Sequence, residues 1–261
     1  MKVKKEREDN NTACYPSLCD KVVVISGGAD GIGADIARAF ATQQAKVVIL
    51  DIAIDKGRVL ASSLGGQFYH CDVTDIVRLQ EVFTQVNAEH DGVDVLINNA
   101  GDDQHHSFSG LTESTFDECI NVNLRHHVFA IQSVSASMAK KGQGVIINLG
   151  SIIWRRGKPG RVGYSISKAA IHGLTRALAH ELGEQGIRIN SLVPGAIKTD
   201  KQQAMWQQLD PEAEQRFLDQ QALKVRLDGQ HCANMALFLA SDESSGCTGQ
   251  DFIVDAGLSI N

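Results

Sequence analysis

The alternation of short apolar runs with longer helical patterns is the feature that most limits how this 261-residue chain can fold. Seven runs rich in β-branched residues are predicted as strands buried on both faces: 21–26, 45–50, 66–71, 93–98, 144–149, 187–192 and 251–256. Six amphipathic stretches are predicted as helices: 31–43, 55–63, 75–89, 114–140, 163–185 and 229–240. This alternation favours a parallel sheet with helices on both faces.

The alternation continues without an internal repeat, a low-complexity block or a long linker, and so predicts one domain over residues 20–261. Residues 1–19 begin with MKVKKEREDNN, which is charged and has no apolar stretch behind it. We expect a flexible tail there rather than a secretory signal. Residues 196–228 carry a helical pattern where a strand is due, and an insertion after the carboxyl end of a strand is typical of a substrate lid.

The composition argues against several classes of protein. Hydrophobic residues make up 43% and charged residues 21%, which is typical of globular proteins. The 25 basic and 31 acidic residues give a net charge of −6, which argues against binding to nucleic acid. No segment is long and apolar enough to span a bilayer. The six cysteines are scattered without metal-type spacing, and we interpret them as reduced thiols of a cytoplasmic protein.

A glycine-rich turn connects the first predicted strand to the first predicted helix. Gly27, Gly31 and Gly33 in the segment SGGADGIGADIARAF permit positive φ angles and let backbone N–H groups approach a pyrophosphate at the helix N-terminus. The spacing differs from the G-x-G-x-x-G dinucleotide fingerprint. A tight strand-to-helix turn without a ligand is the alternative.

An aspartate at the end of the second predicted strand indicates which dinucleotide binds. Asp51 lies about 20 residues beyond the glycines, where a carboxylate accepts hydrogen bonds from the adenosine ribose and repels a 2′-phosphate. Asp30 adds negative charge within the turn, and no Arg or Lys follows Asp51 closely. These features favour NAD over NADP, with a helix-capping or loop role for Asp51 as the alternative.

Tyr164 and Lys168 stand four residues apart in the segment YSISKAAIHGLTRALAHEL, at the start of a predicted helix. Residues at this spacing share one helical face, and a cation beside a phenol lowers the pKa of the phenol from its usual value of about 10. Such a tyrosine acts as a general base near neutral pH. In isolation, the spacing is more often a packed aromatic beside a solvated lysine, so the other motifs decide between the two interpretations.

The glycine turn, the NNAG segment at 98–101, Ser151, Tyr164 and Lys168 follow one another in an order that resembles the short-chain dehydrogenase/reductase family. The resemblance covers nearly all of residues 20–261 and includes the CDVT, NVNL and PGAIKT segments. It implies a Rossmann-type, doubly wound, parallel seven-stranded sheet in a single domain. It also implies an NAD site formed by Gly27, Asp30, Gly31, Ile32, Gly33, Asp51, Asp72, Val73, Asn99, Ala100, Gly101, Tyr164, Lys168, Pro194, Gly195, Ile197 and Thr199.

The same resemblance implies four catalytic residues: Asn123, Ser151, Tyr164 and Lys168. Tyr164 removes the proton from a substrate hydroxyl while hydride leaves the same carbon for the nicotinamide. Lys168 lowers the pKa of Tyr164 and binds the nicotinamide ribose. Ser151 hydrogen-bonds the reacting oxygen, and Asn123 holds a water molecule. The family also pairs the helices predicted at 114–140 and 163–185 across a two-fold axis, which implies a homotetramer.

Five local stretches resemble bacterial aldose 1-dehydrogenases, which oxidise the anomeric hydroxyl of a cyclic sugar to a lactone: NNAGDDQHHSF, NVNLRHHVFAIQ, NLGSIIW, VPGAIKTDKQQAMW and LFLASDESSGCTGQDFIVDAG. This resemblance implies a small-molecule sugar substrate. A polar pocket fits such a substrate, because the loop at 102–106 offers Asp103 and Gln104 to hydroxyl groups and Trp154 is placed to stack on a sugar ring. A solvated loop and a packing tryptophan are the alternatives.

Other substrate classes remain open. The segment WRRGKPGR contains four cations, which suit an anionic substrate such as a sugar acid or a sugar phosphate, or else a solvated loop: Arg155, Arg156, Lys158 and Arg161. A 3-oxoacyl thioester or a hydroxysteroid is a second class of substrate. A non-catalytic module that senses NAD is a third hypothesis.

Two histidine pairs raise the question of a metal site. His105–His106 and His126–His127 are each adjacent in the sequence. No carboxylate or thiolate completes a regular ligand spacing around them. We therefore expect no metal.

Overall fold

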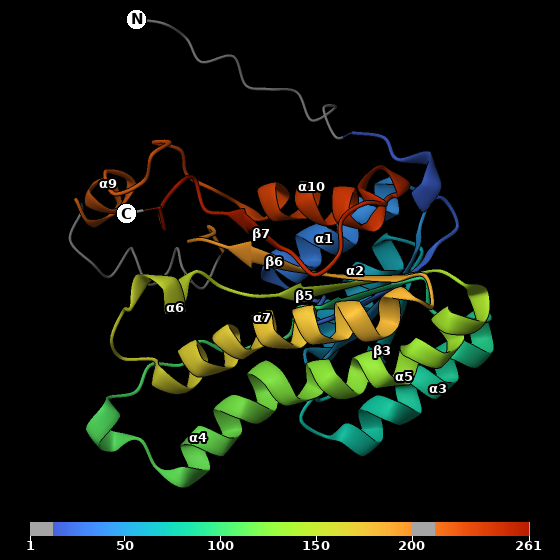
Figure 1. Cartoon of the computed structure of the whole chain (residues 1–261), viewed down its shortest axis with the longest axis horizontal. Helices are drawn as coiled ribbons and strands as arrows, with labels where there is room; N and C mark the ends of the chain where they lie inside the picture. The colour runs from blue at the N-terminus through green and yellow to red at the C-terminus, as the bar shows by residue number, and fades with distance from the viewer. Residues whose placement is uncertain (1–12, 200–211, 261) are drawn as a thin grey trace, which may run out of the picture.

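Seven parallel strands form the centre of the structure, a computed structural model that describes residues 13–199 and 212–260 (Figure 1). Their order is β3-β2-β1-β4-β5-β6-β7. The strands are β1 (Val22–Ser26), β2 (Lys46–Asp51), β3 (Gln67–His70), β4 (Val95–Asn98), β5 (Gly144–Leu149), β6 (Ile187–Pro194) and β7 (Asp251–Val254). The doubly wound parallel sheet expected from the sequence is confirmed.

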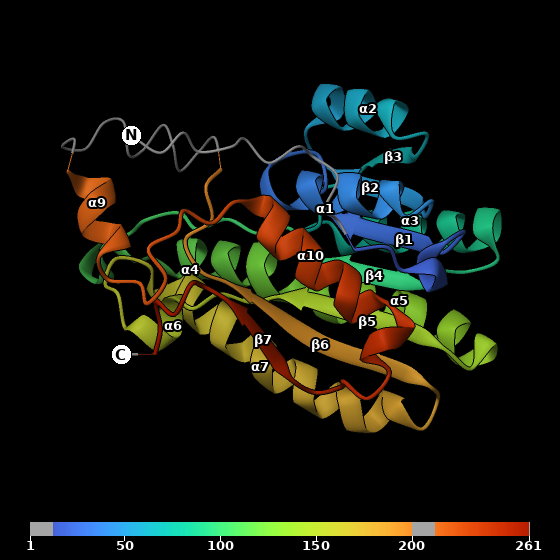
Figure 2. The same ribbon diagram turned by 90° about the horizontal axis from the view of Figure 1, so that it is seen from above.

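Helices cover both faces of this sheet (Figures 1 and 2). One face is covered by α1 (Gly31–Thr42), α2 (Ile54–Ser63) and α10 (Gly229–Ala240). The other face is covered by α3 (Ile76–His90), α5 (His126–Lys141) and α7 (Val162–Gly183). The sheet therefore lies between two helical layers, as expected for strands that are apolar throughout.

The central strand β1 contributes side chains to the hydrophobic cores on both faces of the sheet. Val23 and Ile25 belong to the core beneath α1 and α10, whereas Val22 and Val24 belong to the core beneath α3 and α5. Successive side chains of a strand point to opposite faces, so an uninterrupted apolar run is buried on both. All five residues of β1 are buried.

The helix predicted over 114–140 is divided in the structure. It consists of α4 (Glu113–Ile120), a π-helical turn at Asn121–Arg125, and α5. A π-helical turn adds one residue per turn to the helical path and often occurs at a functional site. It changes the direction of the side chains at 121–125 relative to an uninterrupted α-helix.

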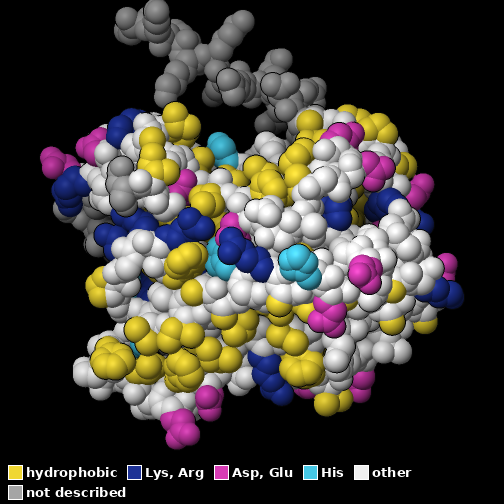
Figure 3. All heavy atoms as spheres, viewed as in Figure 1, with side chains coloured by type: hydrophobic (Ala, Val, Ile, Leu, Met, Phe, Trp, Pro, Cys, Tyr) yellow, Lys and Arg dark blue, Asp and Glu magenta, His cyan; other side chains and the backbone are white. Residues whose placement is uncertain are grey.

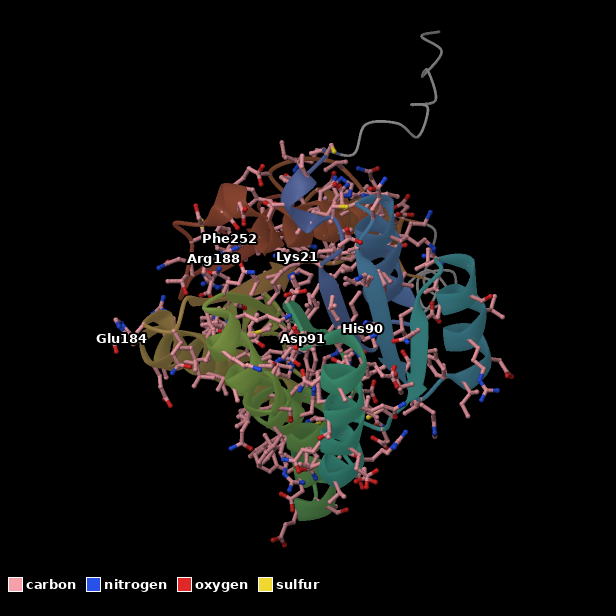
Figure 4. The ribbon with its side chains drawn as sticks, turned by 90° about the vertical axis from the view of Figure 1, so that its right-hand side faces the viewer. Lys21, His90, Asp91, Glu184, Arg188 and Phe252 are labelled. Carbon is pink, nitrogen blue, oxygen red and sulfur yellow. The ribbon has the colours of Figure 1, made fainter. Side chains whose placement is uncertain are left out.

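The order of the strands places a ligand site at one edge of the sheet. The chain proceeds outward from β1 in both directions, and open α/β sheets bind ligands at the carboxyl ends of the strands beside such a switch point. The short helices α6 (Ile153–Arg156) and α9 (Ala213–Leu218) lie at this edge (Figure 1). Figure 4 views the opposite edge, where Lys21 precedes β1 and where Glu184 follows α7.

Part of the predicted N-terminal tail belongs to the folded domain. Residues 13–19 were expected in a flexible tail, but Pro16–Leu18 form a 3-10 turn and Leu18 is buried in the core beneath α1. The backbone N–H of Tyr15 donates to Oε1 of Gln43 at 2.8 Å. Burial of one leucine ties this segment to the domain, so the boundary at residue 19 was wrong. Residues 1–12 lie outside the described residues.

The predicted lid, 196–228, is described only in part. Lys198 forms a parallel bridge with Asp228, and α9 lies near the carboxyl edge of the sheet. Residues 200–211 lie outside the described residues. Within 13–199 and 212–260, no helix has the length and apolar character that a bilayer crossing requires.

Candidate active site

An open cavity of about 1300 Å³ lies at the carboxyl edge of the sheet. Loops that follow β1 to β6 line it, together with Phe217 of α9 and Leu258 after β7. It brings together most of the residues that the sequence predicted for cofactor and catalysis: Gly27, Asp30, Gly31, Ile32, Asp51, Asp72, Val73, Asn99, Ala100, Gly101, Ser151, Tyr164, Lys168, Pro194, Gly195, Ile197 and Thr199.

The glycine turn is shaped by close backbone contacts. Gly27 has a φ of +63°, and a Cβ added there would lie 2.8 Å from the Cα of Ala100. A Cβ on Gly33 would lie 2.1 Å from the carbonyl oxygen of Gly27. Gly33 does not line the cavity; it lets the first turn of α1 approach the end of β1. The turn therefore presents the N-terminus of the twelve-residue helix α1 to the cavity.

Asp51 is held in place by two backbone groups. Its carboxylate accepts hydrogen bonds from the N–H of Ala29 and the N–H of Ala53, each at 2.9 Å, and it lines the cavity. A carboxylate has about four acceptor positions, so two remain for a ligand. Asp51 can therefore both hold the loop backbone and bind a cofactor, two roles that the sequence left as alternatives.

Asp30 has a partner that the sequence did not reveal. Lys56 of α2 forms an ion pair with Asp30, although it follows Asp51 by only five residues. The hydrogen bond from Lys56, assisted by one from the N–H of Gly31, lowers the pKa of Asp30. A cation therefore lies at this end of the cavity after all, with its charge compensated by Asp30.

The NNAG segment joins the central strands. Asn99 donates through Nδ2 to the carbonyl oxygen of Gly27 at 2.8 Å, and the N–H groups of Asn99 and Ala100 donate to the hydroxyl of Ser26. Asn98 donates to Oδ1 of Asn148 at 3.0 Å. These bonds fix the carboxyl ends of β1, β4 and β5 relative to one another. Asp72, after β3, accepts from the N–H and hydroxyl of Thr74.

Asn123 is buried in the π-helical turn and does not itself line the cavity. Its Nδ2 donates to the carbonyl oxygens of Asp102 and Cys119, and its Oδ1 accepts from the N–H of Asp102 at 2.9 Å. It thereby holds the start of the loop after β4 against the π-helical turn. This loop is the one that borders Tyr164 and Lys168 in the cavity.

Ser151 and Tyr164 reach the cavity from different elements. Ser151 follows β5, and Tyr164 lies in the first turn of α7. Burial raises the pKa of Tyr164 to about 12, while a hydrogen bond with Ser151 and the charge of Arg161 act in the opposite direction. The net pKa of this phenol is therefore raised, not lowered, because desolvation of the phenolate outweighs the favourable interactions.

Lys168 is 97% buried and is itself strongly affected by desolvation. Its Nζ donates to the carbonyl oxygen of Leu149 at 2.7 Å. Burial lowers the pKa of Lys168 to about 7. The Lys168 amine is therefore only partly protonated near neutral pH. It can donate a hydrogen bond to a ligand in the cavity and can also gain or lose a proton at this pH.

The pair His126–His127 is buried beneath this site. His126 contacts the carbonyl oxygen of Ala100 through Nε2 at 3.1 Å, and His127 contacts Oδ1 of Asn148 through Nδ1 at 3.2 Å. Burial lowers the pKa of His126 to about 3 and also lowers the pKa of His127. Both rings support the sheet end as neutral groups. No group of three or more potential ligand side chains capable of holding a metal occurs in the described part of the chain.

Two predicted substrate residues are not brought to the cavity. Trp154 donates through Nε1 to Nε2 of His172 at 2.9 Å and does not line the cavity, and Gln104 is exposed away from it. Within the single turn of α6, the residues at 153 and 156 share the face that lines the cavity, so residue 154 points to another side. The structure thus does not place Trp154 where the predicted stacking on a sugar would occur. Asp103 does line the cavity.

Sequence reasoning missed several lining residues. Ile153 reaches the cavity through the helical turn of α6, and a four-residue helix is too short to be recognised by its periodicity. Phe217 belongs to α9, in the segment that was expected to form the lid. Leu258 follows the carboxyl end of β7. Its place in the cavity could have been predicted from the sequence, because the carboxyl ends of the other strands lie at the same edge.

The residues at one end of the cavity fit a dinucleotide. The absence of a Cβ at Gly27 and Gly33 allows the close backbone turn, the N-terminus of α1 faces the cavity, and Asp51 stands at the end of β2. The other end holds Ser151, Tyr164 and Lys168. A dinucleotide site joined to a hydroxyl, a phenol and an amine defines an oxidoreductase that uses a nicotinamide cofactor and acts on CH–OH groups.

Comparison with known proteins agrees with this class. The family model described as enoyl-(acyl carrier protein) reductase matches residues 27–259. The chain belongs to the short-chain dehydrogenase/reductase family.

Three relatives illustrate the range of named activities. D-xylose 1-dehydrogenase of Caulobacter vibrioides is 44% identical over 252 residues, which cover 95% of this chain and 99% of the relative. A probable galactose dehydrogenase of Rhizobium meliloti is 36% identical over 94% of this chain and 97% of the relative. The 3-oxoacyl-[acyl-carrier-protein] reductase of Chlamydia trachomatis is 35% identical over 92% and 98%.

Proposed function

We propose that this protein oxidises the anomeric C1 hydroxyl of an aldose to the lactone, with NAD as cofactor. The observation that carries the proposal is the 44% identity to a D-xylose 1-dehydrogenase over 95% of the chain. The lining of the cavity supports it, because Asp102, Asp103 and His105 offer polar groups to sugar hydroxyls beside Ser151 and Tyr164. Hydroxyl recognition of this kind selects strongly against substrates that lack the hydroxyl.

The proposed cofactor site runs from the glycine turn to the end of β6. Gly31 and Ile32 at the start of α1 bind the pyrophosphate, Asp51 binds the adenosine ribose, and Asp72 and Val73 border the adenine. Asn99, Ala100 and Gly101 border the middle of the dinucleotide, and Pro194, Gly195, Ile197 and Thr199 border the nicotinamide amide. Asp51 supports NAD over NADP, since its carboxylate repels a 2′-phosphate. When bound at this site, NAD would supply the acceptor for the hydride removed from C1.

Tyr164 is the proposed acid and base at the reacting oxygen. It takes the proton of the C1 hydroxyl in oxidation and returns it in reduction, while Ser151 donates a hydrogen bond to the same oxygen. Lys168 binds the nicotinamide ribose and exchanges protons, which its lowered pKa of about 7 supports. Asn123 holds the loop after β4 and a water molecule behind Lys168. Because the pKa of Tyr164 is raised to about 12, oxidation depends on alkaline pH.

We also propose a homotetramer of single-domain subunits, with residues 196–228 as a lid over the substrate. Phe108 is 79% exposed, Val128 41% and Ile166 47%, near the helices that the family pairs. Figure 3 shows hydrophobic side chains gathered at the lower left of this face, where Figure 1 draws α4 and the start of α7. A second copy would remove these side chains from water. The six free cysteines support a cytoplasmic location.

The test is a steady-state assay of the purified protein with NAD or NADP at mildly alkaline pH. The panel contains xylose, arabinose, fucose, galactose and glucose, and the absorbance of the reduced nicotinamide is followed. NAD-linked turnover of an aldose with formation of its lactone is expected. Activity only in the reduction of a 3-oxoacyl thioester would overturn the sugar assignment, and a preference for NADP would overturn the role of Asp51.

A further inference from the structure

The four cations of the segment 155–161 fall into two groups in the structure. Arg155 forms an ion pair with Asp251 at 3.6 Å and lies over the ring of Trp154, away from the cavity. Arg161 forms an ion pair with Asp103 at 3.2 Å and donates to Nε2 of His105 at 2.9 Å. The charges of these two arginines are thus compensated by carboxylates of the protein.

The remaining two cations, Arg156 and Lys158, both line the cavity. Arg156 donates through Nη2 to Oε1 of Gln220 at 2.8 Å, which orients its guanidinium. Neither side chain forms an ion pair with Asp or Glu anywhere in residues 13–199 and 212–260. Two positive charges therefore face the cavity without a carboxylate partner in the described part of the protein.

The position of these cations separates them from the cofactor end. The carboxylates Asp30, Asp51 and Asp72 line the cavity beyond the ends of β1, β2 and β3, whereas Arg156 is the last residue of α6, five residues after Ser151. Figure 3 shows Lys and Arg side chains gathered on the left of this face, where Figure 1 draws α6 and α9. Asp102 and Asp103 also line the substrate end, but Arg161 pairs with Asp103, and with Arg156 and Lys158 the lining cations of that end outnumber its carboxylates.

We propose that Arg156 and Lys158 bind an anionic group of the substrate at the end remote from C1, so that the preferred substrate is an aldose bearing a carboxylate or a phosphate ester. The inference rests on the proposed function and names its substrate class. A guanidinium binds a carboxylate or phosphate through two parallel N–H bonds, and an ammonium adds a point charge. Ser151 and Tyr164 keep the same roles at the C1 hydroxyl, and the reaction remains a two-electron oxidation of C1 to the lactone.

The experiment compares sugars that differ at C6, where one of each pair is neutral and the other anionic: galactose with galacturonate, glucose with glucuronate, and glucose with glucose 6-phosphate. The variants are Arg156→Gln and Lys158→Gln, and Arg155→Gln is the matched control because it removes an equal charge from the same segment. We expect the wild-type kcat/KM to be at least about tenfold higher for an anionic sugar than for its neutral partner. Arg156→Gln should raise KM for the anionic sugar by about tenfold and Lys158→Gln by about threefold, with little change for neutral sugars.

The arms of the experiment separate the sources of the anion. A gain with the uronates alone identifies a carboxylate, and a gain with the sugar phosphate alone identifies a phosphate ester; either result supports the proposal. Equal kcat/KM for neutral and anionic sugars, or equal effects of Arg155→Gln and Arg156→Gln, would overturn it. A rise in KM for NAD instead of the sugar would assign Arg156 to the cofactor and also overturn it.

Failure of the proposed function is recognised separately. If the wild-type protein oxidises neither neutral nor anionic sugars, the proposal of C1 oxidation is wrong. Binding to the anion site is then measured by calorimetric titration with glucuronate and glucose 6-phosphate in the presence of NADH. The anion site is supported if either anion binds and if Arg156→Gln, but not Arg155→Gln, weakens that binding about tenfold. Absence of such binding overturns it.

Discussion

The ammonium nitrogen of Lys168 lies 5.7 Å from the centroid of the Tyr164 ring, one turn further along α7. Burial acts on the two groups in opposite directions, since it raises the pKa of Tyr164 to about 12 and lowers the pKa of Lys168 to about 7. Desolvation disfavours the charged form of each group. The pair therefore favours a neutral phenol beside an amine that gains and loses its proton near neutral pH.

Replacement of Tyr164 by Phe removes the phenolic oxygen and keeps the ring. General acid–base catalysis contributes about 10²–10⁴-fold to a rate, so we expect kcat to fall by at least about a hundredfold. Binding of NADH, measured by fluorescence titration, should change by less than about threefold, because the ring still packs in the cavity wall. Unchanged turnover would remove Tyr164 from the mechanism.

The pH profile of oxidation follows from the raised pKa of Tyr164. Below a pKa of about 12 the base form is the minor form, and its fraction rises tenfold per pH unit. We therefore expect kcat/KM for oxidation to rise between pH 7 and pH 9, by up to about tenfold per unit, and reduction to show no such rise. Initial rates in constant-ionic-strength buffers check this. A flat oxidation profile would mean that another group accepts the proton.

Replacement of Asp51 by Asn tests the choice of cofactor. The amide keeps the shape but removes the charge that repels a 2′-phosphate and accepts the ribose hydroxyls. We expect the ratio of kcat/KM for NAD to that for NADP to fall by about tenfold or more. Asp55→Asn is the matched control, because Asp55 is exposed on α2 and does not line the cavity. The same fall in both variants would point to general electrostatics.

Replacement of Gly33 by Ala tests the close turn of the glycine segment. A Cβ there would lie 2.1 Å from the carbonyl oxygen of Gly27, so the turn must shift. We expect the dissociation constant for NADH to rise by at least about tenfold and the free energy of unfolding to fall by about 1–3 kcal/mol. Gly173→Ala is the control, since its Cβ meets nothing within 4 Å, and a helical alanine should stabilise by up to about 1 kcal/mol.

Acid stability should depend on the buried histidines. Burial lowers the pKa of His126 from 6.5 to about 3, so between these values the unfolded chain binds a proton that the folded chain does not. The free energy of unfolding contributed by His126 therefore falls as pH falls through this window, by about 1.4 kcal/mol per unit at most, and His127 acts in the same direction. Urea unfolding of His126→Gln between pH 4 and pH 7 should show a smaller slope, whereas the exposed control His180→Gln should match the wild type. Identical slopes in all three proteins would exclude His126 as the acid-sensitive group.

Local patterns made most of the fold predictable. Each strand carries its own apolar run and each helix its own amphipathic repeat, so the order of elements and the parallel sheet could be read without knowledge of distant contacts. The carboxyl ends of parallel strands meet at one edge, which is why Asp51, Ser151 and Tyr164 could be placed together in advance.

The errors concern features that depend on neighbours far away in the sequence. Leu18 was assigned to a tail because its three-residue 3-10 turn has no periodic pattern, yet it fills a gap in the core. The helix predicted over 114–140 contains a π-helical turn, and within that turn Asn123 bonds to Asp102, on a loop 21 residues earlier. Such long-range bonds leave no periodic signal.

The sequence by itself determined the parallel sheet, because its alternation is local, and its motifs carried the resemblance that implied the family and the site residues. Only the tertiary structure decided that Trp154 turns toward His172 while Arg156 turns into the cavity, since the rotational setting of a single helical turn depends on what packs against it. It also decided that Lys56 pairs with Asp30 and that burial raises the pKa of Tyr164. Pairing and desolvation arise from groups that meet only after folding, and these quantities set the charge of a site.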